Sequence, residues 1–345
     1  MRQIHSNGRM IVRSIAPLRI SFAGGGTDIA EYSREHGGAV ISSTINYYSH
    51  THLKPSSGPI RLISLDFGTD EKIEHFAYDG KNDLVKATLK RVSRSETPGG
   101  AELFMHTDAP PGSGLGSSSA VVVSLMGALN NWLNQVMDDY ETAELAYEIE
   151  RNELALKGGY QDQLSATFGG FNYIEFLMDG RVVVNPLRLG HDTIKDLECH
   201  LLLSYTGTTR LSANIIDRQI RDFKDGRNVE VLHQQKKMAF EMKNALLKSE
   251  LDDFGLMLDE AWQSKKNMAK GITTPKIDRL YAAAKSAGAV GGKILGAGGG
   301  GYLLLYCNYR KRHEVEKAMH SMGAEPRPFS FVKDGLTVWR SKNEL

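Results

Sequence analysis

The segment that decides the fold lies at residues 110–119 and reads PPGSGLGSSS. It follows a strand predicted over residues 102–107 and precedes an apolar run, 120–136, that predicts a buried helix. Glycines let the backbone approach a ligand closely, and the N-terminus of the next helix adds a favourable partial positive charge. The segment therefore predicts a phosphate-binding loop whose serines cap the helix, donate to phosphate or bind Mg2+. An ordinary flexible loop with serine N-caps is the alternative.

A second glycine-rich segment, GAGGGG at residues 296–301, satisfies the pattern G-x-G-x-x-G of dinucleotide-binding folds. In those folds the glycines open a helix, whereas residues 302–306 form an apolar run that predicts a strand. We therefore disfavour a dinucleotide site. A hairpin turn is the simplest alternative, but four consecutive glycines indicate the close approach of a ligand or of another backbone. The sequence contains no G-x-x-x-x-G-K-[ST], which excludes a Walker-type loop.

A third glycine run occupies residues 24–26 and leads into Thr27 and Asp28. We expect a turn followed by a helix that begins at Asp28, because Asp28 and Glu31 have the spacing of a capping box. Residues 11–23, before the run, predict two short extended segments separated by Pro17. A strand-to-helix turn with a capping aspartate would explain this run without any ligand.

The rest of the chain divides into two differently patterned parts. The first part is largely sheet, whereas residues 212–284 are helical almost throughout and strands return after them. We predict a two-domain α+β protein with domains at 10–190 and 191–345. The other predicted strands are 39–53, 61–65, 72–78, 170–176, 181–186, 290–295, 327–332 and 337–340, and the other predicted helices include 83–92, 141–157 and 310–322.

Composition narrows the class of partner. The 345 residues carry 42 basic and 41 acidic side chains, so no global field favours nucleic acid or an anionic membrane surface. The two cysteines, Cys199 and Cys307, lack a disulfide framework or metal spacing, which favours a reducing compartment. We expect a cytoplasmic protein that binds neither membrane nor nucleic acid. The sequence does not decide the oligomeric state, and a homodimer stays open.

Three segments occur in an order that is typical of one enzyme family. They are APLR at residues 16–19, the loop at 111–119, and KILGAGGGG at 293–301. This ordered set resembles the GHMP kinases, the family of galactokinase, homoserine kinase, mevalonate kinase and phosphomevalonate kinase. The resemblance implies an N-terminal domain of the ribosomal protein S5 domain 2 type and a ferredoxin-like C-terminal domain. It also implies that ATP and its acceptor bind between them.

The resemblance also implies roles for single residues. Asp162 would be the catalytic base, and Arg19 would keep its carboxylate ionised and orient it. Ser118 and Glu150 would bind Mg2+, although Glu148 and Glu153 lie on the same predicted helix. Each carboxylate has a structural alternative, a turn residue for Asp162 and a solvated helix face for Glu150. The expected ATP-binding residues are Pro111, Gly112, Ser113, Gly114, Leu115, Gly116, Ser117 and Ser118.

The string RISFAGGGTD at residues 19–28 resembles the heptose phosphate kinase branch and the related fucokinases. The segment YTGTTR at 205–210 resembles the heptose branch too, and Arg210 could bind the acceptor's own phosphate or be a surface arginine. This resemblance implies a D-glycero-D-manno-heptose 7-phosphate acceptor that is phosphorylated at its anomeric hydroxyl. A fucokinase, another sugar-1-kinase and a non-catalytic sugar or ATP sensor are the alternatives. The expected acceptor-binding residues are Arg19, Gly25, Gly26, Thr27, Asp28, Asp162, Thr208, Arg210, Gly298 and Gly299.

Overall fold

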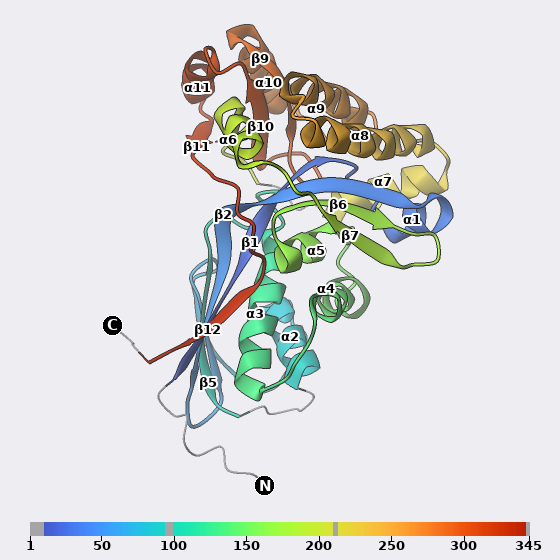
Figure 1. Ribbon diagram of the computed structural model, residues 1–345. Helices are drawn as coiled ribbons and strands as arrows, with labels where there is room; N and C mark the ends of the chain where they lie inside the picture. Colours follow the sequence, from blue (N-terminus) through green and yellow to red (C-terminus); the bar gives the residue numbers. More distant parts are fainter. Residues whose placement is uncertain (1–9, 94–98, 210–212, 343–345) are drawn as a thin grey trace.

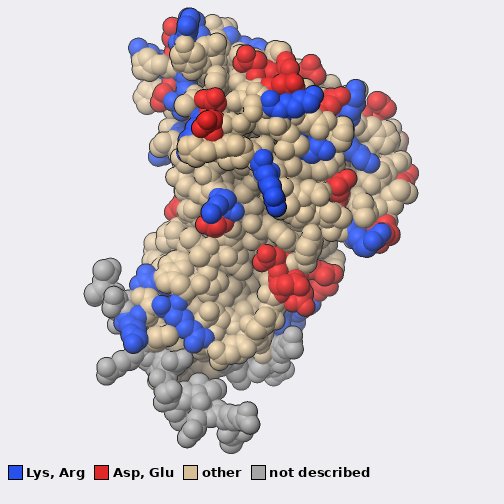
Figure 2. Space-filling model, in the orientation of Figure 1, with Lys and Arg blue, Asp and Glu red and all other residues tan. Residues whose placement is uncertain are grey.

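A computed structural model describes residues 10–93, 99–209 and 213–342 of the chain. In Figure 1 one large twisted sheet fills the lower and middle parts of the molecule, and a second, smaller sheet with long helices lies above it. Figure 2 shows basic and acidic side chains in small separate groups on the same face of the molecule. None of the helices in the described ranges is long and apolar enough to cross a membrane.

The large sheet has eight strands in the described residues, all paired antiparallel except β3 with β5. Its main path runs β12-β1-β2-β5-β3-β4, and β6 and β7 continue from β2. The strands are β1 (Ile11–Ala23), β2 (Gly38–Pro55), β3 (Ile60–Ser64), β4 (Thr69–Ile73), β5 (Ala101–Thr107), β6 (Phe171–Phe176), β7 (Val182–Pro186) and β12 (Thr337–Ser341).

Two strand predictions in this sheet are wrong. β1 is one continuous strand and does not break at Pro17, because the register with β2 shifts between Pro17 and Leu18. Such a bulge accommodates a residue that has no N–H to donate to the ladder. The strand predicted at 72–78 is also misplaced. The observed strand, β4, runs earlier, from Thr69 to Ile73.

Helices α3 and α5 of the first part pack against β1 and β2 of this sheet, α2 and α4 pack on them, and α1 lies apart beside α7 (Ala213–Lys224) (Figure 1). The long helix α3 is buried along most of its length, and the Ser124 hydroxyl hydrogen-bonds the hydroxyls of Ser49 and Thr51 on β2 at 3.1 and 3.0 Å. The prediction of a single helix at 141–157 is wrong. An α-helix ends at Tyr147, and a π-helix continues from Glu148 to Glu153. These helices are α1 (Ala30–His36), α2 (Asp83–Ser93), α3 (Ser117–Leu133), α4 (Asp139–Tyr147), the π-helix η1 (Glu148–Glu153) and α5 (Gln161–Phe168).

The second sheet has the order β11-β8-β10-β9, and its pairs are antiparallel. A strand–helix–strand–strand–helix–strand sequence with this order is the ferredoxin-like arrangement, so that prediction is confirmed. Its strands are β8 (Leu201–Tyr205), β9 (Ala289–Ile294), β10 (Tyr302–Cys307) and β11 (Glu325–Arg327), and the helices around it are α6 (His191–His200), α7 (Ala213–Lys224), α8 (Val229–Leu247), α9 (Leu251–Lys266), α10 (Pro275–Ala287) and α11 (Arg312–Ser321).

The end of the chain returns to the first sheet, which differs from the prediction. Residues 337–340 were expected in the second sheet, but β12 pairs with β1, from Thr337 opposite Ile15 to Ser341 opposite Ile11. The strand predicted at 327–332 is reduced to β11 and an isolated bridge between Phe331 and Ile45. The domain limits at 190 and 191 stay a prediction. β12 follows these limits in sequence but pairs with β1 of the first part.

The core of the large sheet continues into the second part through aromatic contacts. Phe22 is fully buried near the end of β1 and contacts the rings of Phe171, Phe254 and Phe331 at 6.2, 5.3 and 6.2 Å between centroids. Phe254 lies on α9, so these rings join β1 and β6 to a helix of the second part. A single buried side chain therefore supports both parts next to the third glycine run.

Replacing Phe22 with alanine should lower the free energy of unfolding by about 3–5 kcal/mol, because it removes a fully buried ring and leaves a cavity. Phe67→Ala is the control, since Phe67 is 65% exposed and its loss should change stability by less than about 0.5 kcal/mol. Urea unfolding of the three proteins measures both values. Equal midpoints for Phe22→Ala and Phe67→Ala would contradict the assigned role of Phe22.

Candidate active site

A cavity of about 340 Å3 lies where the three glycine-rich segments meet. Its wall includes residues from the 24–26 turn, the 112–119 loop and the 296–300 loop, so segments from the beginning, middle and end of the chain share one site. Several charged side chains also line it, and they are Arg19, Asp28, Glu150, Arg151, Lys157, Asp162 and Lys265.

The central loop leaves a helix N-terminus open to this cavity. Gly112, Gly114 and Gly116 have φ values of 74, 82 and 77°, which glycine adopts without strain. Gly116 precedes α3 without a side-chain cap, and the amide of Ala120 is the first in this helix to bond within it, to the Gly116 carbonyl. The preceding helix amides, at 117–119, therefore lack intrahelical partners and belong to residues that line the cavity. This geometry suits an anion such as phosphate.

The loop at 296–301 packs directly on the central loop, backbone against backbone. A Cβ added at Gly301 would lie 2.2 Å from the Ser113 carbonyl oxygen, and one at Gly114 would lie 2.5 Å from the Leu295 carbonyl oxygen. The amide of Tyr302 donates to the Ser113 carbonyl at 3.0 Å. Gly298, Gly300 and Gly301 thus serve the close approach of other backbone segments, one of the two explanations that the sequence left open.

Asp162 and Arg19 form an ion pair at the edge of the central loop. Arg19 Nε donates to Asp162 Oδ1 at 2.8 Å, and Nη2 lies 2.7 Å from the same oxygen. Arg19 Nη1 also donates to the Gly114 carbonyl at 2.6 Å. The arginine is buried, whereas the Asp162 side chain keeps 23% of its surface exposed. One oxygen of Asp162 is therefore fixed by the guanidinium, and the carboxylate stays accessible from the cavity.

Glu150 lies at the other side of the helix N-terminus, inside the π-helix η1. Ser118 Oγ donates to its Oε1 at 2.9 Å, Ser119 Oγ donates to Oε2 at 2.6 Å, and Gln163 Nε2 also donates to Oε2. A carboxylate and a hydroxyl side by side are oxygen ligands of the kind Mg2+ prefers. The buried Glu150 and the exposed Ser118 therefore fit a magnesium ion that also contacts phosphate at the helix N-terminus.

Asp28 does not cap a helix, so the capping box predicted with Glu31 is wrong. α1 begins at Ala30 after Ile29 and has no side-chain cap. Asp28 instead accepts hydrogen bonds from the amides of Gly26 at 2.9 Å and Gln161 at 3.2 Å. Burial, with a smaller contribution from the charge of Asp162, raises the pKa of Asp28. The carboxyl is therefore a buried polar group at the cavity wall, close to Asp162.

The other predicted residues divide between the cavity wall and its supports. Thr27 is buried behind the wall, where its hydroxyl donates to the carbonyls of Gly24 and Ala39. The carbonyl of Thr208 accepts from the amide of Gly301, and the amide of Gly299 donates to Ile272. Arg210 lies outside the described residues. The predicted residues that line the cavity are Arg19, Gly25, Gly26, Asp28, Gly112, Gly114, Gly116, Ser117, Ser118, Glu150, Asp162 and Gly298, whereas Pro111, Ser113, Leu115, Thr27, Thr208 and Gly299 do not line it.

Lys265 is a cavity residue that the sequence interpretation missed. It lies near the end of α9, is 5% exposed, and donates from Nζ to the Gly296 carbonyl at 2.5 Å. Burial, with a smaller contribution from Arg19, lowers the pKa of Lys265 to about 8. No short motif surrounds Lys265. The one feature of the sequence that could have indicated its role is its position on the face of a predicted helix that points to the core.

These groups together define a class of enzyme. An open helix N-terminus of the kind that suits phosphate lines the cavity, a carboxylate fixed by an arginine faces the same cavity, and cationic side chains line it too. Transfer of a phosphoryl group depends on positioning and on stabilising negative charge, so this arrangement is that of a phosphotransferase.

Comparisons with known proteins give the family. The family model for the GHMP kinases N terminal domain matches residues 83–170, and the model for GHMP kinases C terminal matches residues 242–325. The D-glycero-alpha-D-manno-heptose 7-phosphate kinase of Campylobacter jejuni is 37% identical over 335 residues, which cover 95% of this chain and 99% of that protein. The chain belongs to the GHMP kinase family.

Two further relatives are informative. A crystal structure described as a D-glycero-D-manno-heptose 1-phosphate kinase from Bacteroides thetaiotaomicron has a TM-score of 0.81 and 35% identity, and the match covers 95% of this chain and 98% of that one. The L-fucokinase/L-fucose-1-P guanylyltransferase of Bacteroides fragilis is 28% identical over 86% of this chain but 34% of its own length. The predicted two-domain GHMP fold is thus confirmed.

The buried Lys265 predicts a pH dependence of stability. Because its pKa falls from 10.5 in the unfolded chain to about 8 in the fold, the unfolded chain binds more protons between these values. The contribution of Lys265 to stability therefore rises with pH, by about 2 kcal/mol from about pH 7.5 to about 9.5. Urea unfolding should show that Lys265→Met lacks this rise.

The difference between wild type and variant isolates Lys265, since other groups titrate in both proteins. Lys270→Met is the matched control, because Lys270 is an exposed lysine in the turn after α9, and its pH curve should run parallel to wild type. Parallel curves for Lys265→Met and wild type would show that Lys265 titrates as an ordinary lysine.

Proposed function

We propose that this GHMP kinase transfers the terminal phosphoryl group of ATP to the anomeric hydroxyl of a heptose that carries a phosphate at C7. The observation that carries the reaction is the Arg19–Asp162 pair beside the open N-terminus of α3. The acceptor rests on the 37% identity to the Campylobacter jejuni kinase over nearly the whole of both chains. The product would be the 1,7-bisphosphate.

Asp162 is the proposed base. Its accessible carboxylate would accept the proton of the acceptor hydroxyl as the oxygen bonds to phosphorus. Arg19 fixes the direction of the carboxylate by holding one of its oxygens, and the same guanidinium donates to the Gly114 carbonyl. One side chain thereby ties the base to the loop that would hold the phosphates, which fixes the distance between them.

The amides at the N-terminus of α3 would bind the phosphate oxygens of ATP, and Glu150 and Ser118 would hold Mg2+. When bound, Mg2+ neutralises negative charge on the phosphates. Lys265 would add charge stabilisation from the second part of the chain, because its Nζ lies beside Gly296 at the same cavity.

The sugar would lie toward Asp28, whose carboxyl can bond two hydroxyl groups on the cavity side of the 24–26 turn. The relatives differ in the phosphate that they name, 7-phosphate in Campylobacter jejuni and 1-phosphate in Bacteroides thetaiotaomicron. Arg151 and Lys157 offer cations at the cavity for an acceptor phosphate, in addition to the predicted Arg210. A fucose acceptor stays the alternative, and use of Mg2+, a cytoplasmic location and a homodimer stay predictions.

Replacing Asp162 with alanine should lower kcat by about 100-fold to 10,000-fold while ATP still binds, because the base is lost and the phosphate site is intact. A coupled ATP-consumption assay with heptose 7-phosphate gives the rate, and calorimetry with an ATP analogue gives the affinity. Asp192→Ala, an exposed aspartate on α6, should behave as wild type. Full activity in Asp162→Ala would remove this residue from the role of base.

A screen of heptose 7-phosphate, heptose 1-phosphate, free heptose and fucose identifies the acceptor. We expect the highest kcat/KM with the 7-phosphate. Arg210→Ala should lower kcat/KM for the phosphorylated acceptor by roughly 10-fold to 100-fold and leave free sugars unaffected, because a guanidinium–phosphate bond is lost. The control is Arg310→Ala, an exposed arginine after β10. An unchanged preference in Arg210→Ala would move the acceptor phosphate to other cations.

A further inference from the structure

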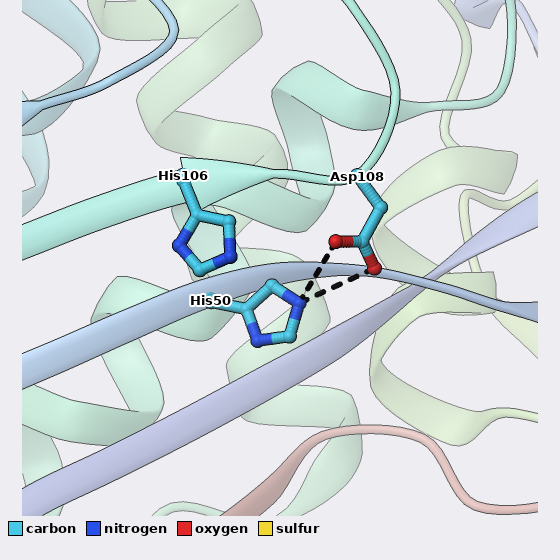
Figure 3. Close-up of side chains that lie close together, drawn as sticks. All are labelled: His50, His106 and Asp108. Carbon is cyan, nitrogen blue, oxygen red and sulfur yellow. Dashed lines mark hydrogen bonds and ion pairs between the residues drawn. The ribbon is translucent and has the colours of Figure 1, made fainter.

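Two histidines and an aspartate meet at the end of β5, on the face of the large sheet opposite to α3. His50 on β2 and His106 on β5 are directly opposite each other in the antiparallel register. Ser49 and Thr51, the residues on either side of His50, point to α3. Because successive side chains of a strand alternate between faces, His50 faces the other side of the sheet. Asp108 follows the end of β5 and completes the group. Figure 3 shows one ring nitrogen of each histidine on the side of the Asp108 carboxylate.

The distances within this group are close to those of a metal site. One ligand atom from each residue lies within 4.8 Å of the others. His50 Nε2 is 3.2 Å from both carboxylate oxygens of Asp108. Ligands around a tetrahedral Zn2+ at about 2.0–2.1 Å from the metal are separated by roughly 3.3 Å. Rotations that unstack the two rings, together with a turn of the carboxylate, would bring one atom of each residue within bonding distance of one ion.

Contacts keep these side chains close together before any metal binds. The rings of His50 and His106 stack with 4.2 Å between centroids and 1° between planes. Asp108 Oδ2 accepts a hydrogen bond from the Tyr48 amide at 2.8 Å. The buried Nδ1 of His106 has no hydrogen-bond partner among the described residues, so a protonated ring would leave a charged N–H unpaired. The neutral imidazole, which is the form that binds metal, is therefore favoured.

The group is also reachable from solvent. The His50 side chain is 23% exposed and that of Asp108 is 34% exposed, so an ion can enter and a water can take the fourth position. Imidazole nitrogens with one carboxylate suit Zn2+ better than Mg2+, which prefers oxygen ligands. The site is separate from the residues that line the large cavity.

We propose that His50, His106 and Asp108 bind one Zn2+ ion that joins β2 to the end of β5. Asp108 is two residues before the start of the 110–119 loop. A bound metal would fix the point from which the phosphate-binding loop leaves the sheet, and it would stabilise the fold because it binds the native chain in preference to the unfolded one.

The test uses the untagged full chain after dialysis against a chelator, with Zn2+ as the only added ligand and no nucleotide. Calorimetry and elemental analysis should give one Zn2+ per chain, and Tm should rise with Zn2+. His106→Gln and Asp108→Asn should each weaken zinc binding at least tenfold and remove the rise in Tm. Co2+ in place of zinc should give visible absorption typical of nitrogen and oxygen ligands in wild type, and this absorption should be lost in both variants.

His191→Gln is the matched control, because His191 lies 3.4 Å from Asp192 in an exposed pair that belongs to no three-ligand group of the described chain. It should bind zinc as wild type does. Circular dichroism and Tm without metal show whether each variant is folded, and Asp108→Asn keeps the shape of the side chain. Failure of wild type to bind zinc, or equal zinc affinity in wild type, His106→Gln and Asp108→Asn, overturns the proposal.

Discussion

The active site depends on the contact between the backbone of the central loop and the backbone of the 296–301 loop. Side chains cannot occupy this contact, because an added Cβ at Gly114, Gly296 or Gly301 would lie 2.2–2.6 Å from backbone atoms of the facing loop. The amide of Tyr302 and the carbonyl of Ser113 then bond at 3.0 Å and hold the two loops in register. The open end of α3 therefore faces a site that both parts of the chain build together.

The charges of the site are fixed by the same packing. Arg19 is buried between Asp162 and the Gly114 carbonyl, and Lys265 is buried against the Gly296 carbonyl, so each cation is attached to one of the two loops. A cation that is only partly neutralised in a dehydrated site favours the binding of an anion. The residues that hold the loops together thus also favour negatively charged ligands between them.

The sequence predicts much of this arrangement because glycine runs mark the places where the backbone takes conformations and close contacts that other residues cannot. The loops at 110–119 and 296–301, Arg19, Glu150 and Asp162 could all be placed by motif, and the structure brings them to one cavity. Lys265 could not be placed by any motif, because it lies in an ordinary charged helix and reaches the site only through the packing of α9. The return of β12 to β1 is a long-range pairing between chain ends, and local patterns do not record such a partner. Asp28 and Glu31 have the spacing of a capping box, but the Asp28 carboxyl instead accepts hydrogen bonds from two other amides. One is that of Gly26 in the preceding turn, and the other is that of Gln161, which is distant in sequence.

The most direct test is a crystal structure of the chain with a non-hydrolysable ATP analogue and Mg2+. We expect the phosphates to lie at the N-terminus of α3 and to contact backbone amides between Gly112 and Ser118, with the metal at Ser118 and Glu150. A triphosphate bound in any other cavity, with this loop free of ligand, would contradict this expectation.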